Sequence, residues 1–65
     1  MSDSRVHYGN YSPYSITINH PYYTNAMSEW AKRLRDTHFI YSLAKMVIHF
    51  AREEDLTAFK LTFNL

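Results

Sequence analysis

The chain has no cysteine and only one glycine among its 65 residues. No disulfide can support the fold, although domains of this size often depend on disulfides, metals or oligomers. The lack of cysteine suits a reducing compartment. A single glycine excludes the glycine-rich loops that bind phosphates, and the G-x-S-x-G turn of many hydrolases is absent as well.

Charge is missing from a long N-terminal segment, since residues 6–28 contain no Asp, Glu, Lys or Arg. Tyrosine is concentrated there instead, and its apolar ring with one polar tip favours contact surfaces. We expect Tyr14 and Tyr23 to complete a thin core. Tyr8, Tyr11 and Tyr22 are harder to bury in so small a fold, so we predict that they bind a partner.

The overall charge and hydropathy restrict the class of protein. The formal net charge is only +1, whereas dedicated nucleic-acid binders rely on many phosphate contacts. The apolar-rich stretch of residues 39–51 is too short and too polar to span a bilayer, and residues 1–5 lack the features of a signal peptide. We therefore expect a cytoplasmic protein with no membrane association.

The composition predicts one small folded domain. Hydrophobic residues make up 46% of the chain and aromatics 17%, which is typical of folded rather than disordered proteins. A chain this short buries only about 60% of its unfolded surface, so self-association would help it. We place the domain at residues 13–65 and a flexible, polar N-terminal arm at residues 1–12.

A strand and a helix are predicted first along the chain. Tyr14, Ile16 and Ile18 alternate with polar residues, which indicates a half-buried strand over residues 14–19 that ends at Pro21. A helix should begin after Thr24 or Asn25 and end near Asp36 or Thr37. Its apolar stripe consists of Met27, Trp30, Ala31 and Leu34.

The topology of residues 38–65 is ambiguous. One group of residues fits either a helical face or a strand, namely Phe39, Ile40, Leu43, Met46, Val47 and Phe50. The acids Glu53, Glu54 and Asp55 favour the start of a helix, because carboxylates oppose the dipole at a helix C-terminus. We predict an α+β fold in the order β-α-β-α, with residues 45–50 as the second strand and two helices packed on a short sheet. The order β-α-α-β is the alternative, and dimerisation could complete the sheet.

Residues 50–63 resemble the C-terminal ends of some short bacteriophage proteins. In those proteins a strand ending in Phe precedes acidic residues and an Ala-Phe-Lys-Leu-x-aromatic helix, as Phe50, Glu53 to Asp55 and Ala58 to Phe63 do here. The resemblance covers about 14 residues and contains no catalytic residue. It implies a phage origin and transfers no activity.

Candidate catalytic and metal-binding residues are few. The four histidines are widely spaced and have no cysteine beside them, whereas structural zinc sites use about four compactly spaced ligands. We expect no metal, no cofactor and no enzymatic activity. Lys32, Arg33 and Arg35 form the main basic concentration, which makes them candidate nucleic-acid contacts.

These features predict a non-enzymatic interaction protein. It would bind and inhibit a larger protein partner, such as a host protein targeted by a phage. The uncharged strand at residues 14–19 lacks edge protection, so it could also pair with a second copy or with a target. The alternative is a nucleic-acid-binding regulator that uses Lys32, Arg33 and Arg35.

Overall fold

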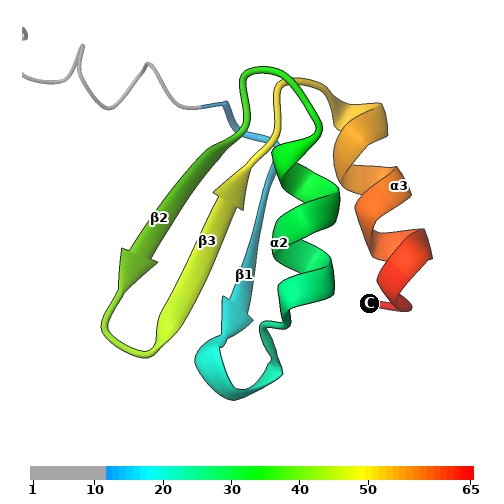
Figure 1. Cartoon of the computed structure of the whole chain (residues 1–65). Coiled ribbons are helices and arrows are strands. Elements are labelled where there is room, and N and C mark those ends of the chain that lie inside the picture. The colour runs from blue at the N-terminus through cyan, green and yellow to red at the C-terminus, as the bar shows by residue number, and fades with distance from the viewer. Residues whose placement is uncertain (1–11) are drawn as a thin grey trace, which may run out of the picture.

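The computed structural model describes residues 12–65, which form a three-stranded sheet with two α-helices (Figure 1). The predicted contact residues Tyr8 and Tyr11, and nearly all of the predicted arm, lie outside the described residues. The elements follow in the order β1 (Ser15–Asn19), the 3-10 helix η1 (His20–Tyr22), α2 (Asn25–Lys32), β2 (His38–Ser42), β3 (Lys45–His49) and α3 (Glu53–Phe63). The predicted α+β class and the single small domain are confirmed.

The sheet has the strand order β1-β3-β2, and both pairings are antiparallel. In the middle row, Val47 of β3 lies between Thr17 of β1 and Ile40 of β2. In the next row, Ile48 lies between Ile16 and Phe39. Because successive strand residues point to opposite faces, these two rows belong to opposite sides of the sheet.

The helices cover the face of the sheet that carries Ile48. Ile48 and Ile18 are buried with apolar side chains of both helices, in a core made of Ile18, Met27, Ala31, Ile48, Phe50 and Phe59. No residue of the opposite face is buried within the described chain, and the residues of that face include Thr17, Ile40 and Val47. The sheet is therefore packed on one side.

Helix α2 begins as predicted but ends earlier. The Thr24 side chain accepts a hydrogen bond from the Met27 backbone N–H, which caps the helix. The prediction that the helix ends near Asp36 was wrong, because α2 ends at Lys32. The Leu34 N–H bonds to the Ala31 carbonyl at 3.1 Å, which tightens the last turn, and Asp36 takes a left-handed φ of 57° that reverses the chain toward β2.

Residues 38–49 form a hairpin rather than a helix. The predicted strand at residues 45–50 is confirmed as β3, and β2 adds one strand to the predicted order β-α-β-α. The alternative β-α-α-β is wrong, since it makes the segment after α2 helical. Strand pairing decides the conformation of this segment. β3 is hydrogen-bonded to β1 on one side and to β2 on the other.

Helix α3 begins at the acid cluster, as the dipole argument predicted. It ends at Phe63; the next residue, Asn64, has a left-handed φ of 61°, and the Leu65 N–H bonds to the Lys60 carbonyl at 2.9 Å. This is the usual pattern of a Schellman C-cap. Phe59 and Phe63 face α2, where both rings lie edge-to-face against Trp30.

Among residues 12–65, no helix is long and apolar enough to cross a membrane. The apolar-rich stretch that raised the question of a membrane span lies mainly in the β2–β3 hairpin.

Candidate interaction surface

One end of the sheet brings together two segments that are distant in sequence. The His20 N–H donates to the Ala44 carbonyl at 2.6 Å, which joins η1 to the turn between β2 and β3. The rings of His20 and Tyr41 also meet edge to face, 5.5 Å apart. Both segments lie at the lower end of the sheet in Figure 1. We call the exposed side chains of Tyr22 and Leu43 at this end the tip surface.

The tip surface is apolar and strongly exposed. Leu43 is 91% exposed and Tyr22 is 70% exposed. Tyr22 was predicted from sequence as a contact residue, whereas Leu43 was not. Large apolar side chains at a loop tip bury little in the isolated chain, so they are suited to contact with another molecule.

Leu43 also has an unfavourable backbone conformation. Its φ is 52° in the two-residue turn that joins Ser42 to Lys45. Such hairpin turns prefer Gly, Asn or Asp at positions with positive φ, and for other residues the left-handed region costs roughly 1–2 kcal/mol. The exposed Leu43 side chain gains no burial that would offset this cost. Backbone strain of this kind is often found at functional sites, so Leu43 is a candidate contact residue.

The basic residues are only partly brought together. Arg33 and Arg35 line a hollow of about 510 Å³, together with Leu34, Asp36, Ala51, Arg52 and Asp55. Lys32 does not line this hollow. Arg52 is a third arginine that the sequence prediction missed, because it is 17 positions away from Arg35. Two aspartates share the hollow, so its charge is mixed rather than uniformly basic.

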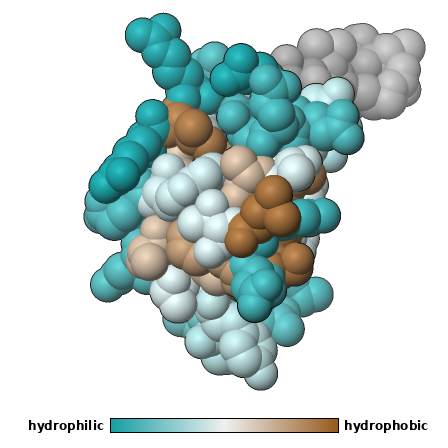
Figure 2. Space-filling view, turned by 90° about the vertical axis from the view of Figure 1, so that its right-hand side faces the viewer, coloured by the Kyte–Doolittle hydropathy of each residue, from teal (hydrophilic) through white to brown (hydrophobic). Residues whose placement is uncertain are grey.

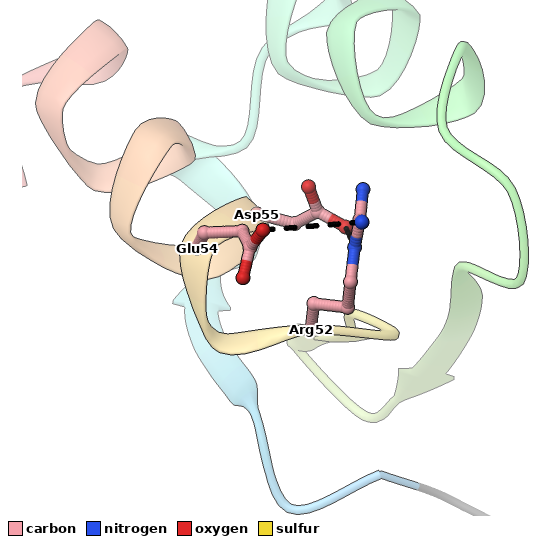
Figure 3. Close-up of polar contacts among 3 residues, drawn as sticks. All are labelled: Arg52, Glu54 and Asp55. Carbon is pink, nitrogen blue, oxygen red and sulfur yellow. Dashed lines mark ion pairs between the residues drawn. The ribbon is translucent and has the colours of Figure 1, made fainter.

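The Arg52 side chain already has acidic neighbours. It lies 3.9 Å from a carboxylate oxygen of Glu54 and 3.6 Å from one of Asp55 (Figure 3). The Arg52 and Glu54 side chains are largely exposed, so these ion pairs contribute little to stability. A phosphate would have to compete with both carboxylates for Arg52.

The outer face of α3 carries a second exposed apolar feature. Leu61 is 76% exposed and Leu65 is 56% exposed. Figure 2 shows hydrophobic surface among polar residues on this side of the molecule. Nearby, a shallow hollow of about 490 Å³ is lined by Glu53, Glu54, Thr57, Ala58 and Leu61. The sequence could have indicated this face, because Ala58 and Leu61 are three positions apart in α3, whereas Leu65 lies beyond the end of the helix.

The histidines within residues 12–65 are spread over the fold. His38 and His49 are opposite each other on β2 and β3, and His49 Nδ1 lies 2.8 Å from the Ser12 carbonyl oxygen. His20 is at the other end of the sheet, where it contacts Tyr41. Within residues 12–65, no group of three or more His, Asp or Glu residues could hold a metal ion.

Comparisons with known proteins add no relative. No protein-family model matches the chain, and neither the search of curated proteins nor the search of solved structures found a match. The resemblance of residues 50–63 to phage proteins therefore stays a prediction.

Proposed function

We propose that this chain is a non-enzymatic interaction protein that binds a larger protein through the tip surface. The observation that carries the proposal is Leu43, which combines 91% exposure with a positive φ in a tight turn. A leucine that gains no burial there has no evident role within the fold. Inserted into an apolar pocket of a partner, it would contribute binding free energy.

Tyr22 and the hydrogen-bonded frame support the same role. Tyrosine is enriched at protein interfaces, and Tyr22 is an exposed residue of η1, the segment that is hydrogen-bonded to the hairpin turn through His20. The His20–Ala44 hydrogen bond and the His20–Tyr41 ring contact hold η1 against the hairpin. A surface held in this way loses little conformational entropy on binding.

The partner is proposed to be a host protein that the chain inhibits. The support is the resemblance of residues 50–63 to short phage proteins, together with a chain of 65 residues that has no recognisable catalytic motif. A small protein can inhibit a larger one simply by occupying one of its surfaces. Tyr8 and Tyr11 remain proposed contacts in this scheme.

The test begins with affinity capture from bacterial lysate, followed by titration with the purified captured protein. The double variant Tyr22→Ser, Leu43→Asn should weaken binding about 30-fold or more, which corresponds to about 2 kcal/mol. Leu61→Ser removes another strongly exposed leucine, from α3, and serves as the control. Equal affinities of the double variant and the wild type would exclude the tip surface.

A nucleic-acid-binding regulator is the second candidate, favoured by the gathering of Arg33, Arg35 and Arg52 around one hollow. Its binding of a single-stranded oligonucleotide should weaken steeply as salt rises. The variant Arg33→Ala, Arg35→Ala should abolish it, while Lys32→Ala, outside the hollow, should have a smaller effect. No binding at low salt would exclude this function.

A further inference from the structure

Within residues 12–65, each outer strand of the sheet has one edge without a strand partner, but the two edges differ in accessibility. On the helix-covered face, Ile18 of β1 is 6% exposed, whereas Tyr41 of β2 is 59% exposed. The helices therefore lie over the β1 side of the sheet and leave β2 largely uncovered, as Figure 1 also shows. A further strand can approach β2 without meeting a helix.

The hydrogen-bond pattern identifies the groups at the free edge of β2. Phe50 N–H bonds to the Tyr14 carbonyl and His20 N–H bonds to the Ala44 carbonyl. Even-numbered residues of β3 therefore bond to β1, and its odd-numbered residues bond to β2. By the same alternation, the backbone groups of Phe39 and Tyr41 point away from β3, toward the free edge.

We propose that two copies of this chain associate by antiparallel pairing of β2 with β2, around a two-fold axis at Ile40. In this register Phe39 of each copy lies opposite Tyr41 of the other, and the two residues exchange backbone hydrogen bonds. The two Ile40 residues face each other on the open side of the sheet. The result is a continuous six-stranded sheet.

The side chains along β2 fit a second copy of the same strand. Phe39 is partly buried and Tyr41 is exposed on the helix side, so the aromatic pairs fill the space between the helices of the two copies. No Asp, Glu, Lys or Arg lies between Asp36 and Lys45, and charged side chains are a common device that blocks such edges. The net charge of +1 also keeps repulsion between the copies small.

The strand β1 is less suited to this role. Pro13 and Pro21 flank it closely and limit the extension of a ladder. Helix α2 also lies beside β1 in Figure 1, so the helices of two copies joined there would be crowded. The structure thus moves the expected pairing edge from residues 14–19, which the sequence favoured, to β2. This association does not depend on the tip surface.

The strands are short, with five residues each. The contact is therefore smaller than the standard interface of about 1,200–2,000 Å². We expect a reversible dimer, so the mass measured by sedimentation equilibrium should rise from 7.8 kDa toward twice that value as concentration increases. Ile40→Lys places like charges at the two-fold axis and should keep the protein monomeric at every concentration.

Disulfide trapping tests the register directly, because the natural chain has no cysteine. Ile40→Cys puts one thiol at the axis, where opposite Cα atoms are about 4.5 Å apart, within the range of about 4.4–6.8 Å for disulfides. Thr17→Cys is the matched control, since Thr17 occupies the same row of the sheet on the β1 edge. In a glutathione buffer, I40C should form covalent dimers at least tenfold faster than T17C.

Circular dichroism and the urea midpoint will show that both variants are folded. If T17C forms dimers as fast as I40C, pairing through β2 is excluded. A wild-type chain that stays at 7.8 kDa up to millimolar concentration also overturns the proposal. The proposal is likewise overturned if β2 pairs with a peptide of another protein and never with a second copy of this chain. The Tyr22→Ser, Leu43→Asn variant should dimerise like the wild type, which separates this result from that of the proposed function.

Discussion

The indole ring of Trp30 and the phenyl ring of Phe59 meet edge to face, with centroids 5.6 Å apart and an interplanar angle of 66°. Trp30 belongs to α2 and Phe59 to α3, so this contact joins the two helices. Phe59 also contacts Phe50 and Phe63 and is completely buried. It is the centre of the aromatic cluster that a 65-residue chain uses in place of disulfides.

Replacement of Phe59 by alanine should unfold most of the protein. A buried Phe→Ala substitution costs about 3–5 kcal/mol. Stability of roughly 0.05–0.15 kcal/mol per residue gives about 3–10 kcal/mol for 65 residues, and a domain this small is expected at the lower end of that range. Phe59→Leu should cost less and remain folded. Urea denaturation followed by Trp30 fluorescence will measure both. Leu61→Ala, two positions away and exposed, should change stability by less than about 0.5 kcal/mol.

Leu43→Gly should stabilise the protein by about 0.5–1 kcal/mol. Glycine adopts a positive φ without steric cost, and the exposed leucine loses no burial when it is removed. Part of the gain is offset by the greater freedom of glycine in the unfolded chain. The adjacent substitution Ala44→Gly is the control. Ala44 has no positive φ, so this variant should be less stable than the wild type. Equal urea midpoints for the two variants would contradict the strain argument.

Thr24→Ala should destabilise the protein by about 0.5–1 kcal/mol. The Thr24 hydroxyl accepts the Met27 N–H at 3.3 Å, and its loss leaves that donor at the start of α2 without a side-chain cap. Thr62→Ala is the matched comparison, because the Thr62 hydroxyl donates to the Ala58 carbonyl within α3. That bond duplicates a helical interaction, so its removal should be neutral or slightly stabilising. In thermal unfolding, the Tm of Thr24→Ala should lie below that of the wild type, and the Tm of Thr62→Ala should equal or exceed it.

Arg52→Ser should stabilise α3 by about 0.5 kcal/mol. Arg52 is the N-cap residue, and its side chain makes no capping hydrogen bond, whereas serine is among the best N-caps. The ion pairs lost with Arg52 are exposed on the arginine side and are expected to contribute a few tenths of a kcal/mol. The gain should grow in 1 M NaCl, which screens those pairs. A urea midpoint below that of the wild type would show that the ion pairs outweigh the cap.

Part of the candidate surface could be read from the sequence. Tyr22 is exposed, as expected for a tyrosine that a small core does not need. Leu43 was missed because the Leu43–Ala44 turn contains no Gly, Asn or Asp, the residues by which such turns are recognised. Arg52 was missed because only the fold brings it beside Arg33 and Arg35.

The sequence by itself determined the elements whose signals are local. The alternation in residues 14–19 predicts β1, the Thr24 cap and the apolar stripe predict α2, and the acid cluster at Glu53 predicts the start of α3. Each of these signals acts through neighbouring residues, by hydrogen bonds to nearby backbone or by the helix dipole.

Only the tertiary structure decided the conformation of residues 38–49 and the end of α2. The same apolar residues fit a helical face and a strand, so local preference did not separate the two. β3 became the central strand because pairing with β1 and β2 satisfies its backbone on both sides while Ile48 is buried beneath the helices. That pairing also leaves β2 at the open edge, a position that no local pattern could reveal.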